Sequence, residues 1–102
     1  MASNLVTALF ATSIDLLNHC GVDKKMAKNI LLPLLQGNVA NLTTFDIKDA
    51  LTGPVERNDV VTIKKHLNVF NQENLNQEKE IYKLLSQKLI EIAQSKNYIK
   101  RL

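Results

Sequence analysis

The side chain best suited to holding a ligand is Arg57, which follows the run Leu-Thr-Gly-Pro at positions 51–54. A guanidinium can clamp a carboxylate or a phosphate through two parallel hydrogen bonds. The competing interpretation is an ion pair with a neighbouring acid, either Glu56 or Asp59. Both interpretations place Arg57 in a structured corner, which we define as residues 51–59.

The other reactive side chains show no spacing that builds a catalytic or metal site. His19 and His66 stand far apart, and neither has a neighbour at metal-ligand spacing. We interpret His66, which adjoins an apolar stripe, as a partly buried structural residue rather than a general acid or base. The 3 glycines stand alone, so no glycine-rich phosphate loop is present. We therefore predict no catalytic residue, no metal ligand and no cofactor-binding residue in this chain.

Other charged and polar residues have simple interpretations. Asp46 and Asp49 fit a solvated helix face, and Lys88 fits a side chain that extends from an apolar stripe to water. The single cysteine, Cys20, excludes an internal disulfide and a cysteine-based zinc cluster. Its place near the end of an apolar helix predicts a buried thiol.

Length and composition predict one globular domain over residues 1–102. The hydrophobic fraction of 45% and the charged fraction of 23% are ordinary for such a domain. A net charge of +3, scattered lysines and well-separated aromatic residues do not favour nucleic-acid binding. No apolar run approaches the about 20 residues of a membrane span, and no basic segment opens a signal peptide. The predicted location is the cytoplasm.

The periodicity of apolar residues predicts helices throughout. Residues 3–20 form the first helix, with Ser3 or Asn4 as its cap and Gly21 at its end. Apolar residues cover about half of its circumference, so we expect a central helix that is contacted from several sides. The remaining stripe of this helix, which includes Asn4, consists of small and polar residues. That stripe fits a cleft, a subunit contact or a solvated face.

The second helix begins after the cap Asp23 and runs toward Leu42. It is apolar all round, which predicts enclosure on most sides, and Pro33 should kink it. An approximate capping box of Thr43 and Asp46 then predicts the start of a short helix that ends in the corner.

Within the corner, Gly53 and Asn58 suit a left-handed backbone, and Asp59 suits the cap of the next helix. That helix carries an apolar stripe at three- and four-residue spacing. Residues 71–76 are polar and loop-like, and a last helix starts near residue 76 or 77. The predicted fold class is all-α, with about five helices.

Three segments together resemble a known family. They are Ala-Ser-Asn-Leu-Val at 2–6, Leu-Leu-Pro-Leu at 31–34, and Ala-Leu-Thr-Gly-Pro-Val-Glu-Arg-Asn-Asp at 50–59 with Thr62 and His66 after it. Over about residues 2–95 the chain resembles the C-terminal helical domain, of unknown function, of Rossmann-like NADP oxidoreductases. That domain is akin to the helical domains of 6-phosphogluconate dehydrogenase, ketopantoate reductase and pyrroline-5-carboxylate reductase. The chain departs from the family at Asn58, where glycine is usual, and it lacks a strand–turn–helix with a glycine fingerprint.

The resemblance implies the substrate-side and dimerisation domain of an NAD(P)-dependent oxidoreductase, inactive alone, with NADP or NAD held by an N-terminal Rossmann domain of the parent protein. It implies that Asn4 faces an interdomain cleft and that Thr52, Gly53 and Arg57 shape or support it. We also expect a homodimer, for which the candidate contact residues are Leu31, Leu32 and Leu35. The alternative is a helical protein-interaction module without an enzymatic role, and a small basic nucleic-acid binder is a weaker third.

Overall fold

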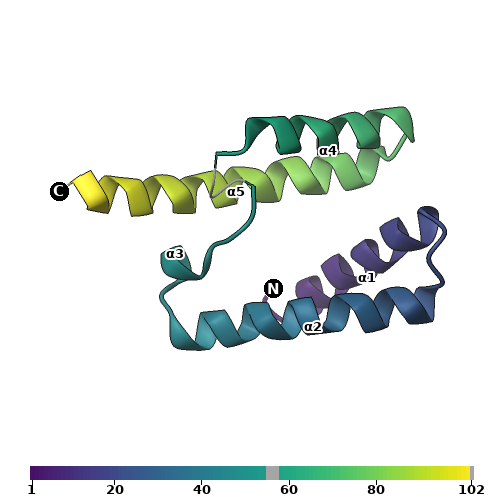
Figure 1. Ribbon diagram of the computed structural model, residues 1–102, viewed down its shortest axis with the longest axis horizontal. Helices are drawn as coiled ribbons and strands as arrows, with labels where there is room; N and C mark the ends of the chain where they lie inside the picture. Colours follow the sequence, from purple (N-terminus) through teal and green to yellow (C-terminus); the bar gives the residue numbers. More distant parts are fainter. Residues whose placement is uncertain (55–57, 102) are drawn as a thin grey trace. The chain divides into compact units, whose positions relative to one another are not determined.

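The computed structural model describes the backbone of residues 1–54 and 58–101, and side chains in these ranges as far as residue 95. It contains five helices, which are α1 (Asn4–His19), α2 (Lys24–Thr44), α3 (Ile47–Ala50), α4 (Val60–Gln72) and α5 (Asn76–Arg101) (Figure 1). No strand occurs in the described backbone, so the all-α prediction is confirmed. The helices group into two compact units, residues 1–41 and 42–102. The single domain over residues 1–102 stays a prediction.

In the first unit, a glycine turn joins α1 to α2. Gly21 has a φ of 95°, and its N–H donates to the carbonyl of Asn18 at 3.0 Å. The N–H of Val22 donates to the carbonyl of Leu17, also at 3.0 Å. These two bonds form the Schellman motif that closes a helix at a left-handed residue. The predicted end of the first helix at Gly21 is therefore confirmed.

Asp23 caps α2 as predicted, because its Oδ2 accepts from the N–H of Met26 at 3.4 Å. The helix then continues past Pro33 and Gly37 to Thr44. The predicted capping box at Thr43 is wrong, since Thr43 lies inside the last turn of α2. A cap needs an extended backbone, and the residue before α3 that has one is Asp46, with φ −62° and ψ 156°.

In the second unit, α4 ends in another Schellman motif, this time on an asparagine. Asn74 has a φ of 56°, and the N–H of Leu75 donates to the carbonyl of Phe70 at 2.9 Å. Asparagine tolerates this conformation better than most residues do. Helix α5 then begins at Asn76, as predicted.

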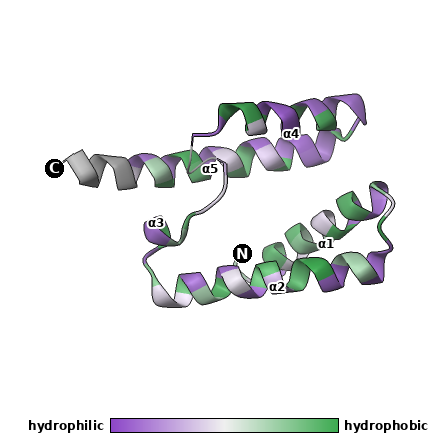
Figure 2. Cartoon of the chain, viewed as in Figure 1, coloured by the Kyte–Doolittle hydropathy of each residue, from purple (hydrophilic) through white to green (hydrophobic). Residues whose placement is uncertain are grey.

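Few side chains are buried within either unit. Among the residues whose side chains are described, Ala27 and Ala50 are the buried hydrophobic ones. Apolar residues lie along both helices of the first unit (Figure 2), yet α1 contains no buried residue and α2 buries only Ala27. The expected enclosure of these two helices is therefore not achieved within the first unit.

The prediction of a buried thiol is also wrong, because Cys20 is exposed. Cys20 follows the last residue of α1 and is the C-cap. The apolar stripe of α1 does not extend to a covered surface at that position, so the thiol stays in contact with solvent.

Candidate functional site

The described part of the corner has a tightly specified backbone. Gly53 has a φ of 94° and Asn58 a φ of 55°, both in the left-handed region. The N–H of Asp59 donates to the carbonyl of Pro54 at 2.8 Å, which closes the corner. The predictions for Gly53 and Asn58 are therefore confirmed.

Asp59 holds the corner to the first turn of α4. Its Oδ1 accepts from the N–H of Thr62 at 3.1 Å, and its Oδ2 accepts from the hydroxyl of Thr62 at 2.7 Å. Both residues are half-buried. One carboxylate thus satisfies a free helix N–H and a hydroxyl together, which confirms Asp59 as the cap.

The residues proposed for a substrate cleft fall in different parts of the chain. Thr52 is exposed and Gly53 is half-buried, and both belong to the corner. Arg57 lies outside the described residues. Asn4 is exposed and is the first residue of α1, in the first unit. Of these four residues, Thr52 and Gly53 are therefore the two that the described structure places in one segment. The roles of all four in a substrate cleft stay predictions.

A cluster of ring side chains joins α4 to α5. Nδ1 of His66 lies 2.8 Å from the hydroxyl oxygen of Tyr82, and the two rings meet edge-on at 5.6 Å. The ring of Phe70 lies 5.4 Å from that of Tyr82. Tyr82 is distant in sequence from the other two rings, and we did not predict its contact with them. The sequence did contain a signal for this contact. His66 and Phe70 share one face of their helix, and Tyr82 on the next helix could pack against that face.

His66 is exposed, so its prediction as a partly buried residue is wrong, although it does have a structural partner in Tyr82. A hydroxyl can donate to a neutral imidazole nitrogen or accept from a protonated one. The contact can therefore persist in both protonation states of His66.

We expect the stabilising contribution of Tyr82 to diminish at alkaline pH. Burial raises the pKa of the Tyr82 hydroxyl above 10.0, and its hydrogen bond with Ser86 only partly opposes that rise. Folded Tyr82 then keeps its proton at a pH where the unfolded chain has lost it, so stability falls as pH rises through the folded pKa. Tyr82→Phe should cost about 1 kcal/mol near neutral pH through the lost hydrogen bond. Urea unfolding at several pH values should show this cost shrinking above pH 10; a cost that grows there would contradict the expectation.

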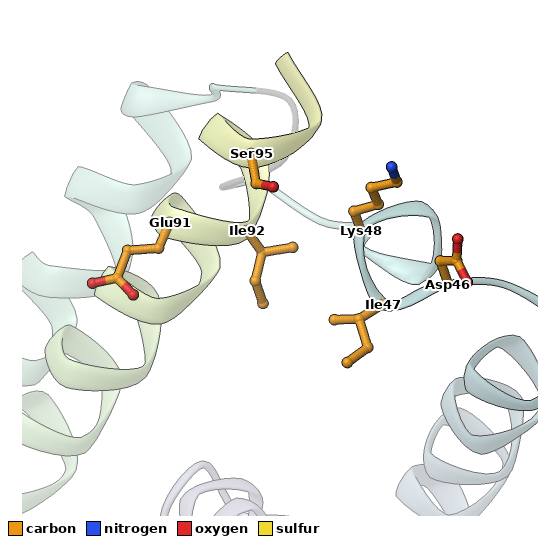
Figure 3. Close-up of a pocket in the computed structure, with 6 residues that line it drawn as sticks. All are labelled: Asp46, Ile47, Lys48, Glu91, Ile92 and Ser95. Carbon is orange, nitrogen blue, oxygen red and sulfur yellow. The ribbon is translucent and has the colours of Figure 1, made fainter. Parts of the chain in front are cut away.

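A shallow hollow of about 480 Å³ lies between α3 and α5 in the second unit. In Figure 3, Ile47 and Ile92 border the hollow, while the charged ends of Asp46, Lys48 and Glu91 point away from it. A ligand pocket normally brings a few polar groups together. The hollow therefore offers an apolar surface without a convergent polar site.

A groove of about 240 Å³ lies between α1 and α2 in the first unit. It is lined by Val6, Leu9, Phe10, Ser13, Leu31, Leu34 and Leu35. Its one polar lining group, the hydroxyl of Ser13, already donates to the carbonyl of Leu9 at 3.1 Å. The groove therefore suits apolar side chains better than a polar ligand. Leu31 and Leu35, two of the predicted contact residues, line it, whereas Leu32 does not.

Among the described residues, no group of three or more His, Cys, Asp or Glu side chains lies close enough to hold a metal ion. None of the helices, over the same residues, combines the length and the apolarity needed to cross a bilayer.

Comparison with known proteins identifies the family of this chain. No curated protein and no solved structure matches the sequence significantly. A family model does match, over residues 1–89, and these residues include α1 to α4, the corner and the first half of α5. The chain therefore belongs to the family described as "Domain of unknown function (DUF2520)".

Proposed function

We propose that this chain is the substrate-side and dimerisation domain of an NAD(P)-dependent oxidoreductase and that it is inactive alone. A Rossmann domain of the parent protein would hold the NADP or NAD. This chain would contribute the corner and its neighbours to the wall of the substrate cleft.

The conformation of the corner is the observation that carries the proposal. The segment with the most specific resemblance to oxidoreductase helical domains also contains two left-handed residues and a capped helix start. Gly53 and Asn58 are both left-handed, and Asp59 fixes the start of α4. Defined backbone conformations on both sides of residues 55–57 would support precise placement of a side chain between them. Arg57, by its chemistry, is the residue that we propose contacts an anionic group of the substrate.

A protein-interaction module is the second candidate function, and the apolar groove of the first unit favours it. Both candidate functions predict a binding surface. They differ because the oxidoreductase role requires a cofactor in the parent protein, whereas the interaction module does not. A cytoplasmic location and the lack of a nucleic-acid partner stay predictions from charge and composition.

The decisive experiment compares the isolated chain with the complete gene product. We expect the coding region to continue upstream, in frame, into a strand–turn–helix with a glycine fingerprint. Calorimetric titration should show NADPH binding to the complete product and none to residues 1–102. NADPH binding by the isolated chain would contradict this division of roles. A complete product that has no dinucleotide fold and does not bind NADPH would leave the interaction module as the function.

A further inference from the structure

We infer that His66 presents its Nε2–H as an oriented hydrogen-bond donor to an anionic ligand, with a carboxylate or phosphate oxygen as the acceptor. The inference goes beyond the proposed function, because it requires neither Arg57 nor the cofactor. It rests on contacts between α4 and α5, which both belong to the second unit.

One nitrogen of the imidazole is held in place. Nδ1 of His66 lies 2.8 Å from the hydroxyl oxygen of Tyr82, and the two ring planes meet at 81°. Tyr82 is itself held by a ring contact with Phe70 and by a side-chain hydrogen bond with Ser86. When one nitrogen of a histidine is bound in this way, the ring is oriented and the other nitrogen points in a defined direction.

Tyr82 also selects the tautomer of neutral His66. Burial raises the pKa of the Tyr82 hydroxyl, and the bond with Ser86 opposes that rise, as a bond donated to the ionised oxygen does. Ser86 is therefore the donor in that bond, and the single proton of the Tyr82 hydroxyl remains for Nδ1 of His66. Neutral His66 then carries its own proton on Nε2. Protonated His66 carries a proton on both nitrogens, so Nε2 is a donor in either charge state.

Nε2 of His66 has no hydrogen-bond partner in the part of the chain that the structure describes. Thr62 lies one helical turn before His66 on the same face of α4. Its hydroxyl already donates to Oδ2 of Asp59 at 2.7 Å. Of the polar side chains described along this face, His66 is therefore the one that still has a donor to offer.

The charges near His66 favour an anion over a neutral acceptor. Lys64 and Lys65 precede it on α4, and neither has an ion-pair partner among the described side chains. On the facing part of α5, residues 78–83, two lysines and two glutamates balance one another. The net local charge is therefore positive, and a hydrogen bond to an ionised oxygen is stronger than one to a neutral oxygen.

Nitrogen-15 NMR of the imidazole rings tests the tautomer in the unchanged chain. At about pH 8 an ordinary histidine is neutral, and we expect the proton of His66 on Nε2 and none on Nδ1. Tyr82→Phe keeps the ring but removes the hydroxyl, so we expect the Nδ1–H form to become more populated. A proton on Nδ1 in the unchanged chain would overturn the inference, as would a tautomer ratio that Tyr82→Phe leaves unaltered.

Titration with sodium phosphate and, separately, with sodium acetate at constant ionic strength tests the donor. We expect the Nε2 signal of His66 to shift saturably with at least one anion, while the signals of His19 do not. A response to phosphate alone assigns a phosphate group to the ligand, a response to acetate alone assigns a carboxylate, and a response to both supports the chemistry that they share. No saturable shift with either anion, or an equal shift at His19, would overturn the inference.

Two variants at position 66 locate the donor. The amide nitrogen of a glutamine side chain can occupy the place of Nε2, whereas that of asparagine reaches only as far as Nδ1. Backbone amide shifts of α4 during the titration give the affinities. We expect His66→Gln to bind within about threefold of the unchanged chain and His66→Asn at least about tenfold more weakly.

Circular dichroism checks that both variants are folded, and the titration of the unchanged chain decides the inference if either one unfolds. Equal losses of affinity in the two folded variants would contradict a donor at the Nε2 position. None of these measurements involves NADPH, so their failure and the failure of the oxidoreductase role are distinguishable.

Discussion

Replacement of Gly53 by alanine should destabilise the chain by about 1–2 kcal/mol. Gly53 has a φ of 94°, which a residue with a Cβ rarely adopts. No atom lies within 4 Å of the position that the new Cβ would take, so the expected cost comes from backbone strain and not from a clash. Urea denaturation of both proteins at one fixed chain concentration would measure it, since the midpoint of any chain that self-associates depends on concentration.

Gly37→Ala is the matched control for this experiment. Gly37 lies inside α2, and the space around its new Cβ is equally open. Since alanine favours a helix more than glycine does, we expect this change to stabilise the chain by about 0.5–1 kcal/mol. The same substitution should thus have opposite signs at the two positions. Equal effects would show that the left-handed backbone at Gly53 is not required.

Replacement of Asp59 by alanine should cost about 1–2 kcal/mol. The change removes the acceptor for the Thr62 N–H at 3.1 Å and for the Thr62 hydroxyl at 2.7 Å. Both groups of Thr62 would lose their partner in a half-buried position, and the start of α4 would fray. Urea unfolding gives the loss, and hydrogen exchange of the first amides of α4 locates it.

Two further variants separate the effect of the lost capping hydrogen bonds from the effect of the lost negative charge. Asp59→Asn keeps one acceptor oxygen and should retain much of the stability. Asp46→Ala removes another aspartate at a helix N-cap, but Asp46 makes no side-chain capping bond, so we expect a change within about 0.5 kcal/mol. An Asp46 effect as large as that of Asp59 would refute the hydrogen bonds to Thr62 as the cause.

The segments that carry the resemblance to oxidoreductase domains lie between residues 2 and 66, within the residues 1–89 that the family model matches. Family membership fixes no activity, because the function of the domain is unknown. The complete gene product, assayed for NADPH binding, is the route from family to activity.

Local sequence patterns were sufficient to predict several local features of this fold. Asp23 and Asp59 are caps, and Gly21, Gly53 and Asn58 are left-handed, as predicted. Each of these features depends on hydrogen bonds and sterics within a few residues, so the local pattern is sufficient. The left-handed conformation of Asn74 is another such local feature, and the asparagine residue type was the signal from which it could have been predicted.

Other features depend on residues that are distant in the sequence, and the local pattern could not predict them. Thr43 is a good cap by type, but α2 continues through it, and Asp46 precedes the next helix instead. The contact between Phe70 and Tyr82 depends on how α4 and α5 pack, and the exposure of Cys20 depends on which surfaces are covered. Helical periodicity identifies an apolar face, but burial is a property of what packs against that face. For α1 and α2 only the tertiary structure showed that their packing against each other within the first unit leaves an apolar groove.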